Sequence, residues 1–135
     1  MGWAAFTTGV VHIFEGDPRG AVAHLSRARD LLEAVPDYPL LASALCHCAL
    51  ALVQLGRTRE ALPLLVRGRE LRRRYSVRAQ MATLSVLVSA ETYVLALENK
   101  GLIDGERASL LRWARIGCKE AMRHGRQGRD DKGVR

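Results

Sequence analysis

Histidines are the first side chains to consider for chemistry, because imidazole binds metals and moves protons near neutral pH. The four histidines are His12, His24, His47 and His124. No two of them stand four residues apart, the spacing that lets one helix present two imidazoles to a zinc ion. We therefore predict no metal site, and we expect His12 to be a packing residue.

The three cysteines are equally poor candidates for a reactive centre. Cys46 and Cys48 are two residues apart, and on a helix they would point about 200° from each other. They cannot clamp one metal together, and with Cys118 they are too few for a disulfide framework. We expect all three to be reduced and to pack as small apolar residues.

A catalytic site needs a nucleophile positioned by a base, or paired carboxylates in a cleft. The sequence shows no such constellation, and Glu91 and Glu98 are spaced two helical turns apart, as ordinary surface charges are. There is also no phosphate-binding loop of the form GxxxxGK[ST]. We predict that the chain is not an enzyme and that it uses no cofactor.

An arginine cluster is the strongest chemical signal in the sequence. Six guanidinium groups fall within twelve residues, at Arg67, Arg69, Arg72, Arg73, Arg74 and Arg78. Because Arg pairs bidentately with carboxylate or phosphate, this patch could hold an acidic or phosphorylated partner. A solvated helix face is the interpretation that we favour. Nucleic acid is a third option, and it is disfavoured because only Tyr75 is available for base stacking.

The overall charge is basic, with 21 Lys and Arg residues against 14 Asp and Glu residues and a net charge of +7. Only three of the basic residues are Lys, and a GC-rich coding sequence would also produce such an excess of Arg. No apolar run reaches the roughly 18 residues of a membrane span, and the N-terminus has no basic leader. We expect a cytoplasmic protein that does not bind membranes.

Apolar residues recur at helical spacing almost throughout, and no stretch alternates as a strand would. We predict six helices, over residues 3–15, 18–34, 40–55, 58–74, 77–100 and 104–124. Asp17 should cap the second helix, with Pro18 in its first turn. Thr58 should cap the fourth, and Gly56 should end the third in a left-handed conformation. Residues 125–135 hold three glycines and almost nothing apolar, so we expect a disordered tail.

The predicted helices repeat with a period of forty residues. Between residues 16 and 31, seven of sixteen positions are identical to the residue forty positions later. The pairs are Gly16/Gly56, Arg19/Arg59, Ala21/Ala61, Leu25/Leu65, Arg27/Arg67, Arg29/Arg69 and Leu31/Leu71. Such a period is typical of helical hairpins that stack on one another to bury their apolar faces.

The spacing of small and large residues resembles that of the tetratricopeptide repeats. The first unit supplies Gly9, His12, Gly16, Ala21, Leu25 and Ala28, and the second supplies Ala49, Leu52, Gly56, Ala61, Leu65 and Gly68. The resemblance is good over about residues 2–75 and poor over about residues 80–124. It implies an all-α fold in which antiparallel helical hairpins stack as a short right-handed superhelix of about six helices.

The length of the unit adds a second resemblance. A period of forty residues exceeds the usual period of about 34, and stretched units of this kind are similar to the arrays in large bacterial regulators. Those regulators contain an ATPase module, and they end in a LuxR-type DNA-binding domain or begin with a nucleotide cyclase domain. The resemblance implies a stand-alone module or a part of such a regulator.

In this family the first helix of each hairpin lines a concave groove. The resemblance therefore indicates which residues of this chain would form a groove or a packing face. Its residues are Trp3, Phe6, Val10, Ile13 and Phe14 in the first unit and Ser43, Cys46, Leu50, Val53 and Gln54 in the second. One interpretation is a peptide-binding or helix-binding surface anchored by Trp3 and Phe6. We favour the interpretation that this face packs on a preceding repeat or, in a homodimer, on a second subunit.

We predict a protein–protein interaction module made of one repeat domain over residues 1–124, with units of about 1–37, 38–75 and 76–124. Its partner would be a protein, a peptide or a neighbouring domain of a larger bacterial regulatory chain. The first alternative is a ligand-sensing segment of an ATP-dependent transcription factor or of an adenylate or guanylate cyclase. The second alternative is a basic nucleic-acid-binding protein.

Overall fold

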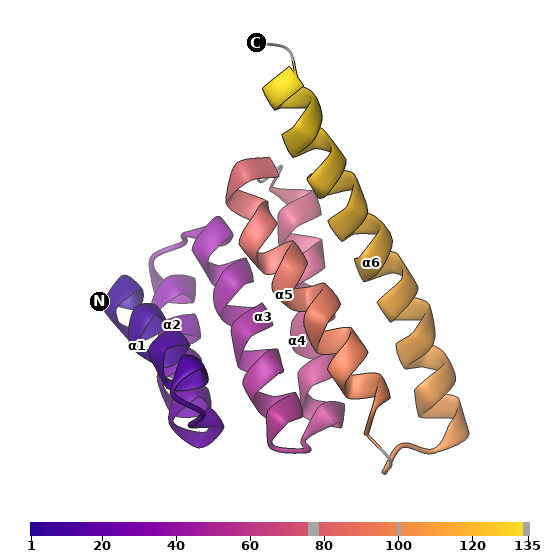
Figure 1. Ribbon diagram of the computed structural model, residues 1–135. Coiled ribbons are helices and arrows are strands. Elements are labelled where there is room, and N and C mark those ends of the chain that lie inside the picture. Colours follow the sequence, from indigo (N-terminus) through magenta and orange to yellow (C-terminus); the bar gives the residue numbers. More distant parts are fainter. Residues whose placement is uncertain (76–78, 100, 134–135) are drawn as a thin grey trace.

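The computed structural model describes residues 1–75, 79–99 and 101–133, and helices account for most of them. They are α1 (Gly2–Phe14), α2 (Pro18–Ala34), α3 (Tyr38–Gln54), α4 (Thr58–Arg74), α5 (Ala79–Leu97) and α6 (Asp104–Gly133). No strand occurs within these ranges. Figure 1 shows α1, α3 and α5 as one layer, with α2 and α4 behind it and α6 beside α5. The predicted all-α stack of helical hairpins is confirmed.

The turns between helices explain where the first helices begin and end. The Asp17 carboxylate accepts a hydrogen bond from the backbone N–H three residues on, at 3.0 Å, and so caps α2. Asp37 caps α3 in the same way, at 3.2 Å. Gly16 and Gly56 both have a φ of +76°, the left-handed conformation that glycine adopts without a steric penalty. The caps predicted at Asp17 and Gly56 are confirmed.

The cap predicted at Thr58 is wrong. Thr58 is the first residue of α4, so Arg57 stands in the capping position, and its side chain makes no capping hydrogen bond. The Thr58 hydroxyl instead accepts a hydrogen bond of 2.8 Å from the side-chain amide of Asn99. This bond ties the beginning of α4 to the chain just beyond α5.

The forty-residue repeat is visible in the packing of α2 and α4. Residues 21–32 and 61–72 show the same order of buried, half-buried and exposed positions. A Cβ atom added to Gly68 would lie 3.0 Å from the Cys46 sulfur. The small residues of the repeat therefore set how closely the helices approach one another, as close packing requires.

The third hairpin departs from the repeat in its turn and in its core. α6 begins seven residues after the last residue of α5, whereas the second helix begins four residues on in each of the first two hairpins. α5 buries Ser85, Ser89 and Thr92 where the second unit has Leu or Ala. The Ser89 and Thr92 hydroxyls donate to carbonyl oxygens four residues earlier, at 2.7 and 2.6 Å. Because these hydroxyls are satisfied locally, polar residues can occupy core positions of the repeat.

The C-terminal end of α6 extends beyond the other helices (Figure 1). The sequence predicts a helix end near residue 124 and a disordered tail over 125–135, but the structure continues the helix to Gly133. Residues 134–135 lie outside the described part of the chain. Arg, Gln and Lys have helix propensities close to that of Ala, so they add little to the cost of about 1 kcal/mol that each glycine brings to this helix.

Candidate interaction face

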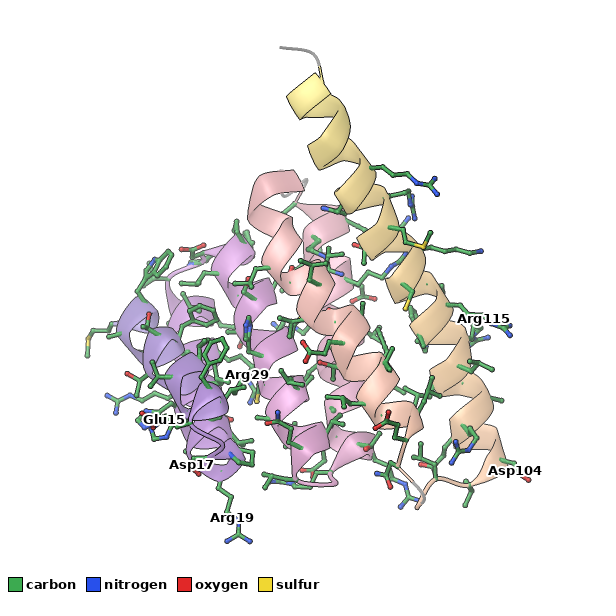
Figure 2. The ribbon with its side chains drawn as sticks, viewed as in Figure 1. Glu15, Asp17, Arg19, Arg29, Asp104 and Arg115 are labelled. Carbon is green, nitrogen blue, oxygen red and sulfur yellow. The ribbon has the colours of Figure 1, made fainter. Side chains whose placement is uncertain are left out.

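The helices of the front layer are almost free of charge. Within the described bounds of α1, α3 and α5 the only Asp, Glu, Lys or Arg is Glu91, whereas α4 alone contains eight such residues. Figure 2 shows the contrast elsewhere, with Arg115 on α6 and Arg19 on α2 pointing away from the stack. The charges of this basic chain therefore lie mostly on the second helices of the hairpins.

α1 contributes an apolar stripe to the front layer. Phe6 is buried, and its ring meets the ring of His47 on α3 edge-on, with 5.3 Å between ring centroids. Trp3 and Val10 stand three residues before and four residues after Phe6, so they border it on the helix surface. Phe14 follows Val10 by one turn. Trp3 is 64 % exposed and Phe14 is 85 % exposed, and clustered apolar exposure of this kind marks interaction sites.

α3 forms the middle of the layer, and its His47 is buried there. Ser43, His47 and Leu50 are spaced by four and three residues, so they share one side of the helix, and Gln54 follows them as an exposed residue. Nδ1 of His47 donates a hydrogen bond of 2.7 Å to the Ser43 carbonyl, which leaves Nε2 as an acceptor in the neutral ring. The pKa of His47 is lowered, because burial disfavours the protonated ring. The hydrogen bond to Ser43 and the negative charge of Glu91 act in the opposite direction and raise the pKa by less.

α5 supplies the third part of the layer. Glu91 is exposed on α5, and its negative charge raises the pKa of His47 on α3. Leu87 and Val94 stand four residues before and three residues after Glu91, and Leu84 lies one turn earlier. These three apolar side chains are each about half exposed, between 49 and 52 %. An exposed apolar stripe on α5 thus surrounds the single charge of the layer.

We refer to these residues together as the α1–α3–α5 face. Its members are Trp3, Val10, Phe14, Ser43, His47, Leu50, Gln54, Leu84, Leu87, Glu91 and Val94. Its members differ in exposure, because Ser43, His47 and Leu50 are each only 5 % exposed and Val10 is half-buried. Two further residues that the sequence predicts for this face are Phe6, which is buried, and Ile13, which is half-buried against the core. Val53 is likewise half-buried against the core.

Cys46 does not lie on the face where the sequence predicts it, because its side chain is turned towards α4 and α5. Its sulfur lies 3.0 Å from the Ser89 hydroxyl oxygen and accepts a hydrogen bond of 3.8 Å from the Arg72 guanidinium. Burial raises the pKa of this thiol, while Arg72 opposes the effect. One residue rotates a helix by about 100°, so the neighbouring His47 takes the position that the sequence gives to Cys46.

The arginine cluster of α4 is divided among several partners. Arg67 forms an ion pair with Glu33 of α2. Arg69 and Arg72 both pair with Glu120 of α6, at 3.5 and 3.2 Å. These three arginines thus connect α4 to two other helices, and the two carboxylates of Glu33 and Glu120 balance part of their charge.

The other members of the cluster lie at the end of α4. The Arg74 guanidinium lies over the Tyr75 ring at 5.5 Å from its centroid, and that ring stacks on Tyr38 with 3.7 Å between centroids. Arg73 is exposed, and Arg78 lies outside the described residues. Among the cluster members that the structure describes, Arg73 and Arg74 are the two without a carboxylate partner.

Arg72 is a core residue of the second unit. It is 6 % exposed and stands forty residues after Leu32, which is buried in the first unit. Its guanidinium donates to the Glu120 carboxylate at 3.2 Å and to the Ser85 hydroxyl at 3.3 Å. Because a buried charge is tolerated only when it is paired, Arg72 and Glu120 form a structural pair that fastens α6 to the second hairpin.

A crevice of about 510 Å³ lies between the beginnings of α4 and α6. Leu62, Leu102 and Leu110 line it, together with Arg59 and Glu106, which bind each other at 2.8 Å. In the part of the chain that the structure describes, no group of three or more His, Cys, Asp or Glu side chains could hold a metal ion. No described helix is long and apolar enough to cross a membrane.

Stacked helical hairpins with one apolar layer define the class of helical-repeat interaction proteins. Within this class the chain belongs to the tetratricopeptide repeat family, because the sequence model of that family matches residues 4–74, just over half of its length. The match spans α1 to α4, the two units with the clearest repeat. Searches of curated proteins and of solved structures found no match. Members of this family typically bind other proteins.

Sequence reasoning missed five members of the α1–α3–α5 face, namely His47 on α3 and Leu84, Leu87, Glu91 and Val94 on α5. His47 is an isolated histidine in the sequence, and Glu91 looks like an ordinary surface charge. A count of charges helix by helix would have found Glu91, because the other residues of the first helices are uncharged. The spacing of four and three residues from Ser43 to Leu50 would have placed His47 between them.

Proposed function

We propose that this chain is a protein–protein interaction module of the tetratricopeptide type that holds a segment of a partner protein on the α1–α3–α5 face. The main support for the proposal is that Trp3 and Phe14, on the apolar stripe of α1, are exposed. Buried aromatic anchors dominate the energetics of protein interfaces. Covering one large apolar side chain contributes about 1.5–3 kcal/mol.

A protein fits this face better than a nucleic acid. Binding to a phosphate backbone depends on Lys and Arg, and α1, α3 and α5 contain neither residue within their described bounds. The centres of protein interfaces are instead poor in charge and rich in aromatic residues. The contact segment of the partner is therefore apolar on at least one side.

The module is further proposed to be part of a larger bacterial regulatory protein of the cytoplasm. The support is the forty-residue period, which resembles the stretched arrays of regulators that contain an ATPase domain. A neighbouring domain of the same chain would then be the natural partner. An ATPase or nucleotide cyclase domain in the surrounding reading frame would support this proposal, and a frame limited to this chain would contradict it.

Site-specific photo-crosslinking in cells tests the interaction function. A photoreactive benzoylphenylalanine at Thr7, which is exposed on α1 between Trp3 and Val10, should yield one discrete adduct with a partner protein. The matched control is the same substitution at Ala23, an exposed residue of α2 on the other layer. The partner found in this way must then bind the purified chain in a calorimetric titration.

Three results would contradict the proposal. Equal adducts from positions 7 and 23 would show non-specific capture. An adduct that contains only two copies of this chain would assign the face to a homodimer. An adduct from position 7 whose partner fails to bind the purified chain would show proximity without affinity.

A further inference from the structure

Glu91 is an isolated charge within the exposed apolar stripe of α5. It is exposed, and Leu87 and Val94 flank it on the same side of α5. A partner segment that covers these two side chains must also cover Glu91, because the three lie on one helical stripe. Removing a carboxylate from water without a counter-charge opposes binding.

The described residues of α1, α3 and α5 offer no cation to neutralise Glu91 on this face. α1 and α3 contain no Lys or Arg within their described bounds, and Glu91 is the only charged residue of α5 there. His47, whose pKa the Glu91 charge raises, is buried and donates its Nδ1 proton to the Ser43 carbonyl. The compensating charge therefore has to come from the partner.

Resting on the proposed function, we propose that the partner segment is an amphipathic helix that places one Lys or Arg opposite Glu91. Apolar side chains of that helix cover Leu87 and Val94, and others cover Trp3 and Phe14 on α1. On α5 the apolar neighbours stand three and four residues from the charge, and packed helices present matching rows. The partner helix accordingly carries apolar residues three or four positions to each side of its single cation.

A second copy of this chain does not meet that requirement. In a symmetric dimer both subunits present the same patch. Two α1–α3–α5 faces would bring together two Glu91 carboxylates and no Lys or Arg. The charge of the face therefore favours binding of a different protein over binding of a second copy of this chain.

Two designed peptides test the inference with the full chain. Each is an 18-residue helix with leucines at helical spacing along one side, and at the centre of that side one peptide has Lys and the other has Glu. The Lys peptide should bind at least about tenfold more tightly, because like charges in an interface are strongly unfavourable. Isothermal titration calorimetry in low salt measures both affinities.

Variants at Glu91 assign the preference to this carboxylate. Glu91→Gln should remove most of the discrimination between the two peptides, and Glu91→Lys should reverse it. The matched control is Glu98→Gln, which removes an exposed carboxylate near the end of α5 and should leave the discrimination unchanged. Circular dichroism establishes that each variant retains its helices.

The outcomes separate this inference from the proposed function. Equal binding of both peptides, or a preference that survives Glu91→Gln, would overturn the inference and leave the interaction function in place. If neither peptide binds, the inference fails, and the crosslink from position 7 decides whether the proposed function fails with it.

Discussion

At residue 72 the second repeat unit buries an arginine where the first unit, forty residues earlier, buries Leu32. The Arg72 side chain is 5 % exposed, and that of Glu120 is 16 % exposed. Burying two charges costs desolvation free energy that their attraction only partly recovers. Loss of one member is much worse, because the other remains buried without a counter-charge.

We expect Glu120→Ala to lower the free energy of unfolding by about 3–5 kcal/mol, the usual cost of an unpaired buried charge. Urea denaturation followed by circular dichroism measures the change. Glu70→Ala removes an exposed carboxylate of α4 and should change the free energy by less than about 0.5 kcal/mol. Equally small effects in both variants would show that α6 does not depend on this pair.

His47 makes the stability of the chain depend on pH. Because burial lowers its pKa in the folded state, the unfolded chain takes up a proton more readily as the pH falls below about 6.5. Stability is then lost on acidification and is fully present above that pH, since the unfolded state binds more protons. Between pH 7.5 and 5.5 the melting temperature should fall more in the wild type than in His47→Asn, which retains an amide donor and does not titrate. Parallel curves would refute the assignment.

At the scale of helices, the small residues of the repeat decide how the hairpins cross. Ala61 is 1 % exposed on α4, so a larger side chain has no room. Ala61→Leu should lower the free energy of unfolding by about 1–3 kcal/mol through overpacking. The control Ala23→Leu makes the same change at an exposed position of α2 and should be nearly neutral. An unchanged melting temperature for Ala61→Leu would show that the repeat register is wrong.

The sequence predicted the first two hairpins because their signals are local. Asp17 with Pro18 marks the beginning of a helix, and glycine at positive φ marks an end, so such boundaries can be read from a few neighbouring residues. The side of a helix is harder to predict, since an offset of one residue exchanges Cys46 for His47. Contacts between helices that are distant in sequence, such as Arg72 with Glu120, leave no local signal.

The third hairpin shows where pattern recognition fails. Ser89 and Thr92 occupy core positions, but their residue types are typical of surfaces. Their hydroxyls bond to carbonyl oxygens of the preceding turn, and a pattern of apolar residues cannot register this compensation. The family match likewise ends at residue 74, although the helical stack continues through α5 and α6.

For the molecule as a whole, the distribution of charge matters more than its sum. The net charge of +7 suggests an acidic partner when the composition is considered alone. The structure assigns nearly all charges of the described residues to the second helices and the turns, and within the described bounds of α1, α3 and α5 the front layer has only Glu91. A basic chain therefore offers an apolar surface whose single charge is negative.

This asymmetry leads to a prediction about the oligomeric state. Exposed Trp3 and Phe14 favour association, whereas a symmetric contact through the same face would bury two Glu91 carboxylates without a cation. We expect the second effect to win, so light scattering should give a mass close to the 14.9 kDa of one chain. A dimer that dissociates in Trp3→Glu would show that a second copy covers the face. A dimer unaffected by Trp3→Glu would place the contact elsewhere and leave the α1–α3–α5 face open to another protein.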